Sequence, residues 1–469
     1  MRLSEKILFF LIRIFRFNFG IFEKEEFKKF LHMGLILALI IGVYWTLRPL
    51  KDSIFMQLVD KMHLPYAKTI SVLALFPFVM FYTKLLEQTS REKMLIILPA
   101  FYGISILCFG AVIGITQASP EIIATRSIIL FIGTKVLGYV WYLFVESFGS
   151  LIFALFWAFA ADTTKPDSAK RGFPLVVALG QIGGALLPYT VGGLPHRLSL
   201  TTDALSITIL GLLTLTIIPL VRYFLKITPS ELLHPFEEKD IKNKDENKQK
   251  PSFFEGLKLL VKHRYLLGIF AAHFIYDFVV TIFDFNFKVA AGTAYSGVEL
   301  SNYLSIYGSS INIISLFCLF LGISNVTRFL GVGVALTCMP IIVSLALFGF
   351  LALDSLPFLF ALMVGSKAIN YSLNGPTLKQ LYIPTTSAVR FKAQAWIEVF
   401  GARTSKEAGS LFNMLLNPLQ SIFGAMTGRA YYLISSGVIG FPLLALWFAI
   451  ALYLGRTFRK AITEEKVVC

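Results

Sequence analysis

Long apolar runs separated by short polar segments make up most of the chain. The stretches 95–115, 204–220 and 331–353 contain no charged residue, and each is close to the length of a membrane-spanning helix. A bilayer interior offers no water to backbone polar groups, so runs this long predict helices and not barrel strands. We therefore expect an all-α polytopic membrane protein with twelve transmembrane helices. The predicted spans are 30–57, 66–87, 94–116, 137–161, 171–193, 203–225, 263–289, 300–323, 329–353, 356–378, 394–418 and 431–455.

One long polar segment interrupts this pattern, between the sixth and seventh spans. It is rich in Lys, Glu, Asp and Asn and cannot build a core, which predicts a linker. Six spans precede it and six follow, the arrangement of a duplicated carrier. The predicted parts are an amphipathic N-terminus 1–29, a six-helix half 30–226, a linker 227–256, a second six-helix half 257–456 and a tail 457–469.

Basic residues flank alternate ends of the spans. The positive-inside rule then places both termini and the linker in the cytoplasm. The net charge of +15 would suggest nucleic-acid binding in a soluble chain. Here membrane topology explains most of it, with an anionic substrate as a second contributor, so we expect no nucleic-acid partner. The residues on the basic side are Lys28, Lys29, Arg91, Lys93, Lys170, Arg171, Arg390, Lys392, Arg456, Arg459 and Lys460.

Ionisable residues inside the first half are candidates for function, because each costs about 2.5–3.5 kcal/mol at membrane depth. Arg48, Lys51 and Asp52 lie in the first span, and their spacing puts them on one helical face. The alternative is an interfacial anchor at the helix end. Glu146 lies near the middle of the fourth span. It either takes up a proton or pairs with a cation such as Lys51.

The seventh span carries four ionisable residues on one face. His273, Asp277, Asp284 and Lys288 follow one another at spacings of four, seven and four residues. Asp284 and Lys288 would form an ion pair. His273 and Asp277 would relay a proton, although a buried packing histidine is the commoner case.

The tenth and eleventh spans supply further cations. The sequence Asn374-Gly375-Pro376 predicts an interrupted helix, whose backbone groups would suit ions or anions. Nearby cations would bind a polyanionic ligand, or else anchor the helices at the membrane interface. These cations are Lys367, Lys379, Arg403 and Lys406.

Motifs for other chemistry are missing from the sequence. We find no GxxxxGK[ST] phosphate loop, no HExxH, no GxSxG and no cysteine–histidine metal cluster. We therefore expect no ATP hydrolysis, no cofactor, no metal and no enzymatic activity.

Several motifs together resemble a known family. They are LRPLKD at 47–52, ESFGS at 146–150 with FW at 156–157, AKR at 169–171, and YSLNGPT at 371–377 with YIP at 382–384. In this order they resemble the nucleotide transporter (ATP/ADP translocase) family of plastids and intracellular bacteria, from about residue 26 to 410. The resemblance implies a fold similar to major-facilitator carriers. It also implies import or exchange of nucleotides across a bacterial inner membrane or, alternatively, a plastid inner envelope.

The charged residues of this family can be assigned one at a time. Its first-span lysine falls on Lys51 and its fourth-span glutamate on Glu146. Its seventh-span glutamate falls on Asp284, a conservative change. Its tenth-span lysine falls on Leu378, so that cation is missing, although Lys379 is adjacent. The resemblance thus implies transport of some nucleotide more strongly than strict ATP/ADP exchange.

Our hypothesis is an alternating-access nucleotide transporter with its site between the two halves, embedded in the lipid bilayer. One alternative is a carrier of another organic anion or of a nucleotide-containing cofactor, and another is a membrane enzyme or scaffold acting on lipids. The expected substrate-binding residues are Arg48, Lys51, Glu146, Asp284, Lys288, Lys379, Arg403 and Lys406, and the coupling candidates are Asp52, Glu146, His273, Asp277 and Asp284.

Overall fold

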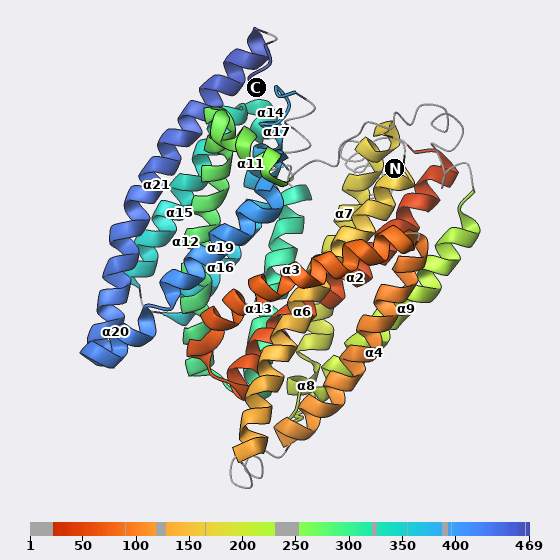
Figure 1. Ribbon diagram of the computed structural model, residues 1–469, viewed down its shortest axis with the longest axis vertical. Helices are drawn as coiled ribbons and strands as arrows, with labels where there is room; N and C mark the ends of the chain where they lie inside the picture. The colour runs from red at the N-terminus through yellow and green to blue at the C-terminus, as the bar shows by residue number, and fades with distance from the viewer. Residues whose placement is uncertain are drawn as a thin grey trace, which may run out of the picture. The chain divides into compact units, whose positions relative to one another are not determined.

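In the computed structural model, every secondary-structure element of the described part of the chain is a helix (Figure 1). The predicted N-terminal segment is described only from residue 22 on, and residues 230–252 of the predicted linker lie outside the described residues. The described ranges are 22–89, 91–118, 128–164, 166–229, 253–320, 326–353, 355–386, 393–394, 396–464 and 466–469.

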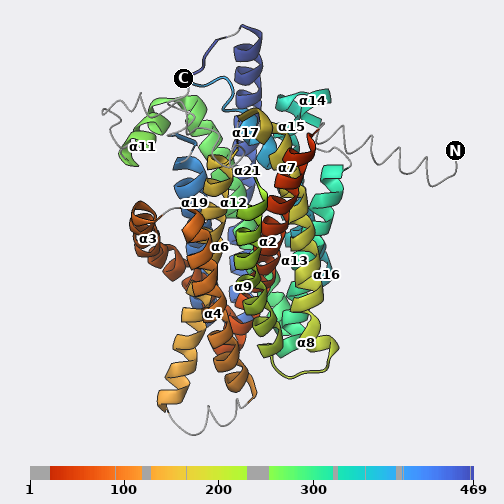
Figure 2. The same cartoon turned by 90° about the vertical axis from the view of Figure 1, so that its right-hand side faces the viewer.

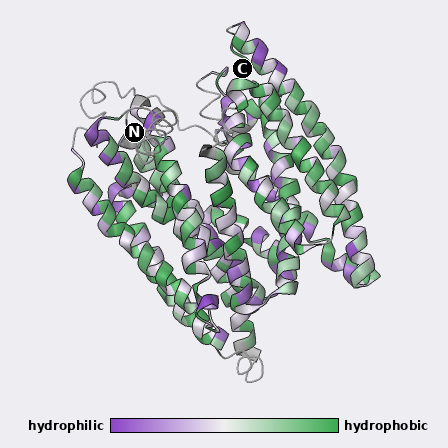
Figure 3. Cartoon of the chain, turned by 180° about the vertical axis from the view of Figure 1, so that it is seen from behind, coloured by the Kyte–Doolittle hydropathy of each residue, from purple (hydrophilic) through white to green (hydrophobic). Residues whose placement is uncertain are grey.

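Nine helices within these ranges are long and apolar enough to cross a membrane. Apolar residues cover most of the helix lengths in Figure 3. The helices of the first part of the chain are α2 (Lys24–Leu58), η1 (Lys61–His63), α3 (Leu64–Gln88), α4 (Arg91–Ala118), α6 (Ile128–Asp162), α7 (Pro166–Leu187), η2 (Pro188–Gly192), α8 (Leu194–Arg197) and α9 (Ala204–Ile227). Those of the second part are α11 (Phe253–Lys262), α12 (Arg264–Ala294), α13 (Gly297–Phe320), α14 (Val326–Phe329), α15 (Val332–Ala352), α16 (Leu356–Ile369), η4 (Asn370–Asn374), α17 (Gly375–Gln380), η5 (Ile397–Gly401), α19 (Ala402–Asn413), α20 (Leu416–Phe423) and α21 (Ala425–Thr463).

The nine membrane-length helices coincide with nine of the predicted spans. Helices α3, α13 and the pair α19 and α20 occupy the remaining three spans, 66–87, 300–323 and 394–418. The ends of the helices differ most at α6, which begins at Ile128 and not near 137, and at α21, which extends past the predicted 431–455 on both sides.

A glycine with a positive φ angle directly precedes each of two helices. Gly331 precedes α15 and Gly424 precedes α21, with φ angles of 84° and 82°. This left-handed backbone conformation costs a residue with a Cβ atom more than it costs glycine. The chain can therefore turn sharply at both points and enter a new helix at once.

The chain divides into two compact units, and three helices contribute residues to both. Unit 1 comprises Met1–Ile54, Leu75–Glu246 and Gly297–Asn312. Unit 2 comprises Phe55–Ala74, Asn247–Ser296 and Ile313–Cys469. The shared helices are α2, α3 and α13. The predicted halves 30–226 and 257–456 stay a prediction.

In unit 1, α4 packs along α9, as both Figure 1 and Figure 2 show. Helices α2 and α7 also approach closely. A Cβ atom added at Gly183 of α7 would lie 2.0 Å from the carbonyl oxygen of Ala38 in α2. The absence of a side chain at this glycine therefore permits the contact that holds α2, which carries several predicted site residues, against its neighbour.

In unit 2, α12 is the central helix and contacts α16, α19 and α21. Most of its residues between Ala272 and Ala291 are buried, including polar ones. Helix α21 packs along α15. Polar side chains on α12 are thus surrounded by other helices, where they need partners.

The structure replaces the predicted helix break at Asn374-Gly375-Pro376 with a π-helical turn. Asn370–Asn374 form this turn, η4, and α17 begins directly at Gly375. The N–H of Gly375 donates a hydrogen bond to the carbonyl of Asn370, so the backbone stays helical. Pro376 is tolerated because it occupies the first turn of α17, where prolines are accommodated.

Candidate functional site

A first cluster of charged residues lies in unit 1 and joins α2 to α6. The ammonium group of Lys51 donates a hydrogen bond to Oε1 of Glu146. Its Nζ atom is 3.5 Å from Oδ1 of Asp52. The side chains of Lys51 and Asp52 are each 3% exposed, whereas that of Glu146 is 37% exposed. We call these three residues with Arg48 the Lys51 cluster. Of the two roles predicted for Glu146, the structure shows the pairing with Lys51.

Both cations of the Lys51 cluster lie over aromatic rings. Lys51 Nζ lies 3.8 Å from the centroid of the Tyr142 ring, which is one turn before Glu146 on α6. The guanidinium of Arg48 lies 5.3 Å from the centroid of Trp45. Such cation–π contacts contribute about 0.5–2 kcal/mol each. The cluster holds two formal positive and two formal negative charges, so it is electrically balanced.

A second cluster of charged residues lies in unit 2 around one carboxylate. Asp284 on α12 contacts Nζ of Lys288, one turn later, at 2.6 Å and Nζ of Lys367 on α16 at 2.7 Å. Nζ of Lys68 on α3 lies 3.5 Å from the same carboxylate. We call these four residues the Asp284 cluster. The predicted pairing of Asp284 with Lys288 is confirmed, and two further cations join it.

The Asp284 cluster is mostly buried and electrically unbalanced. The side chains of Asp284, Lys288 and Lys367 are 7%, 7% and 9% exposed, and that of Lys68 is 23% exposed. Three lysines face one carboxylate. Removing an ion from water costs several kcal/mol unless it is paired. Three lysines gathered around one buried carboxylate are therefore suited to receive an anion.

A third set of predicted residues gathers around His273 in unit 2. The charged neighbours of His273 are Asp277, Glu398, Lys379 and Lys406. Among the residues that the structure describes, neither the His273 ring nor the Asp277 carboxylate forms a hydrogen bond or an ion pair. The proton relay therefore stays a prediction. Arg403, another predicted cation, is partly buried on α19, the helix that also carries Lys406.

Sequence reasoning missed Lys68 and the contact of Lys367 with Asp284. Lys68 was visible as an ionisable residue within the apolar second span, the same signal that identified Lys51. Leu378, where the family lysine is missing, is 1% exposed in α17. The side chain at that position is therefore buried.

A buried acidic residue in unit 1 was also missed. Asp203 directly precedes α9 and is 0% exposed. Its Oδ2 atom accepts hydrogen bonds from Gln117 of α4 at 3.0 Å and from Ser301 of α13 at 2.9 Å. The Ser301 hydroxyl is in turn 2.7 Å from that of Ser53, which follows Asp52 on α2. Asp203 thus links the start of α9 to three other helices.

Comparison with known proteins identifies the family. The family model described as TLC ATP/ADP transporter matches residues 11–458. The chain belongs to this family. ADP,ATP carrier protein 1 of Rickettsia bellii is 25% identical over 468 aligned positions, which cover 91% of this chain and 92% of the relative. ADP,ATP carrier protein 3 of the same organism is 24% identical and covers 84% of this chain and 88% of its own length.

Solved structures with the same fold are also transporters, though distant in sequence. A bacterial homologue of the iron transporter ferroportin superposes with a TM-score of 0.56 at 12% identity and covers 93% of this chain and 98% of its own. The nucleoside transporter NupG superposes with a TM-score of 0.54 at 14% identity, and the match covers 92% of this chain and 99% of NupG. The TLC-family chain therefore shares its fold with these two solved structures.

Proposed function

We infer that this chain is a secondary transporter that moves nucleotides across a bacterial inner membrane. Its membership of the TLC family supports this function, and the Asp284 cluster is the observation within the chain that carries it. Nucleotides differ from most metabolites in carrying two to four negative charges on adjacent phosphates. The three lysines around the buried Asp284 carboxylate place several positive charges equally close together.

In the empty carrier, Asp284 would keep the three lysines together. Without it, three ammonium groups would repel one another in a poorly hydrated site. A phosphate group that enters would share these ammonium groups with Asp284, and each charge-assisted hydrogen bond would contribute about 1.5–3 kcal/mol. The carboxylate therefore acts as a placeholder for the phosphate and fixes the positions of its ligands in advance.

The Lys51 cluster would act as a second contact in this mechanism. Lys51 is the more buried of the two cations in this cluster, and it already contacts two carboxylates. Glu146 is the more exposed of the two carboxylates, so it is the partner that Lys51 can exchange for a substrate oxygen. We propose that Lys51 passes between Glu146 and the substrate, and that Arg48 strengthens the local field.

The finer architecture follows the family. We propose twelve transmembrane helices, alternating access and cytoplasmic termini. The position of the family's tenth-span lysine holds the buried Leu378. We therefore propose that the carrier accepts nucleotides other than ATP and ADP and separates triphosphate from diphosphate poorly.

Uptake by intact bacterial cells that express the chain tests this function. Labelled ATP, ADP, AMP and other nucleotides are offered to cells with and without an uncoupler, and efflux of preloaded label is followed on adding each unlabelled nucleotide. We expect saturable uptake of at least one nucleotide that the D284A variant, present in the membrane at equal amount, does not support. Failure of a correctly inserted wild-type chain to transport any nucleotide, with uptake of another organic anion, would establish the alternative carrier.

A further inference from the structure

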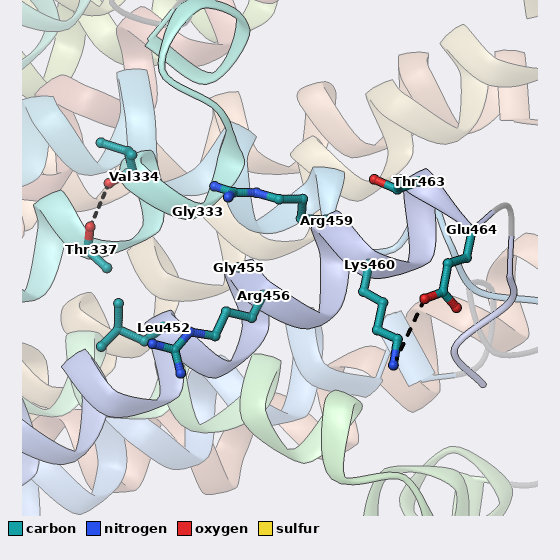
Figure 4. A pocket seen from close by; sticks show the side chains of 10 residues that line it. All are labelled: Gly333, Val334, Thr337, Leu452, Gly455, Arg456, Arg459, Lys460, Thr463 and Glu464. Carbon is teal, nitrogen blue, oxygen red and sulfur yellow. Dashed lines mark hydrogen bonds and ion pairs between the residues drawn. The ribbon is translucent and has the colours of Figure 1, made fainter.

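A basic pocket lies in unit 2 at the crossing of α15 and α21, on residues that the proposed transport mechanism does not use. Its volume is about 500 Å³. Arg456, Arg459 and Lys460 of α21 line it together with Thr337 of α15 (Figure 4). The pocket therefore combines three cations with a hydroxyl group at one end of a membrane-length helix.

The two arginines of the pocket are available to a ligand. Within the described part of the chain, neither the Arg456 nor the Arg459 guanidinium forms a hydrogen bond or an ion pair. The carboxylate at the rim, Glu464, pairs instead with Lys466 at 3.0 Å and approaches Lys460 at 3.9 Å. Figure 4 shows Arg459 extending toward Gly333 of α15, while Arg456 lies beside Leu452. The positive charge of this pocket is thus largely uncompensated.

Two glycines form the floor of the pocket. A Cβ atom added at Gly455 of α21 would lie 2.6 Å from the Cα atom of Gly333, so the two backbones are in direct contact there. A Cβ added at Gly333 would lie 3.9 Å from a terminal nitrogen of Arg459. The missing side chain at Gly455 therefore permits the contact of α15 with α21, and Arg459 lies within van der Waals range of Gly333.

Exposed apolar residues continue from the pocket along both helices. On α15, Ile341, Leu345 and Phe348 follow Thr337 on the same face and are 48%, 69% and 66% exposed. On α21, Leu452 and Phe448 precede Arg456 at intervals of one turn, and each is 38% exposed. A ligand that matches both features has an anionic head and long apolar chains.

We propose that this pocket binds the headgroup of an anionic phospholipid. Arg456 and Arg459 would contact the phosphodiester, because guanidinium groups bind phosphate oxygens in pairs. The acyl chains would lie against the exposed stripes of α15 and α21. Basic pockets between transmembrane helices recognise lipid headgroups in this way. A free phosphate ion would use the arginines but gain nothing from the apolar stripes.

The test compares the R456Q/R459Q variant with a matched control. R222Q/K226Q removes two positive charges from exposed positions in the last turns of α9, which does not line the pocket. Each protein is purified in detergent, and its thermal unfolding is followed as phosphatidylglycerol, phosphatidylcholine or inorganic phosphate is added. Native mass spectrometry of the same samples counts bound lipids. All four substituted residues are exposed, so both variants should fold.

We expect phosphatidylglycerol, but not phosphatidylcholine, to stabilise the wild type and the control and to remain bound in the mass spectrometer. R456Q/R459Q should lose at least tenfold in apparent affinity for phosphatidylglycerol. Equal loss in the control would show that general surface charge attracts the lipid, and no loss in R456Q/R459Q would show that the arginines are interface anchors. Equal stabilisation by inorganic phosphate alone would show an ion site. Each of these three results overturns the proposal.

Discussion

Lys51 and Asp284 each contact oppositely charged residues, but in different proportions. Lys51 has two carboxylates near it, and with Arg48 the local charge sums to zero. Asp284 has three lysines near it, so the formal charges of these four residues alone sum to a surplus of +2. The consequence of a substitution therefore depends on whether it leaves a buried charge without a partner or only reduces that surplus.

Lys51→Ala should abolish nucleotide uptake. The substitution also leaves the buried Asp52 without the cation 3.5 Å away, and breaking a buried pair costs about 3–5 kcal/mol. The double variant K51A/D52N also removes the charge of Asp52. We expect it to regain the melting temperature of the wild type but not uptake, whereas K51R should keep partial uptake. Membrane content, thermal unfolding and uptake are measured on all three. Normal uptake by K51A at normal expression would show that Lys51 is an interfacial anchor.

Lys68→Gln should weaken the binding of phosphates while leaving the fold intact. Lys288 and Lys367 still neutralise Asp284 in this variant, so little stability should be lost. One charge-assisted contact contributes about 1.5–3 kcal/mol, which corresponds to an affinity about tenfold to a hundredfold lower. Competition of unlabelled ATP, ADP and AMP against a labelled substrate measures this, and ATP should lose most.

The matched control for Lys68 is Lys61→Gln. Lys61 lies in η1 just before α3, and its Nζ atom bonds to the hydroxyl of Thr293 at 2.7 Å and not to Asp284. K61Q should therefore leave the nucleotide ranking unchanged. Equal losses in K68Q and K61Q would remove Lys68 from the site.

At the scale of helices, buried polar residues decide which elements are held together. Asp203 connects the start of α9 to α4 and α13. In unit 2, the hydroxyl of Tyr432 on α21 donates to Asn413 of α19 at 2.6 Å and accepts from Asn286 of α12 at 3.2 Å. Within a membrane, apolar contact does not favour protein over lipid, so such links specify the helix neighbours.

Asp203→Ala should lower the stability of the protein. It leaves the Gln117 amide and the Ser301 hydroxyl without their shared acceptor, and an unsatisfied buried group costs about 1–3 kcal/mol. Asp203→Asn keeps one acceptor oxygen and should lose about half as much. Thermal unfolding of both purified variants measures the difference. If D203N and D203A unfold together at the wild-type temperature, the link does not hold the helices.

At the scale of the whole molecule, the predicted even number of membrane crossings would place both termini on the same side of the membrane. Tags at both termini and in the segment 238–250 should all be protected from reagents that cannot cross the membrane, because the positive-inside rule predicts that the basic span ends face the cytoplasm. Accessibility labelling in intact and permeabilised cells measures this. Labelling of one terminus in intact cells would require an odd number of spans.

The membrane helices were predictable because an apolar run of sufficient length has few other stable structures. Lys51, Glu146 and Asp284 were predictable for a related reason, since a charge inside such a run is costly unless it has a function. Their partners were harder to predict. Lys68 and Lys367 are separated from Asp284 by 216 and 83 residues, and helical periodicity does not indicate which helices become neighbours. An aspartate directly before a helix, such as Asp203, is common in sequences. Its burial depends on the packing of distant helices, which the sequence does not show.

The π turn at Asn370–Asn374 changes how positions in this helix should be counted. Residues eleven apart in a regular α-helix lie on nearly the same face, because each residue turns the helix by about 100°. Leu378 is eleven residues after Lys367, but the π turn lies between them and accommodates one additional residue. Lys379 therefore takes the direction that an uninterrupted helix would give to residue 378. Deleting the exposed Tyr371 should accordingly turn the π turn into α-helix and leave Lys379 facing as it does now, whereas Leu378→Lys would only place a charge in a packed position.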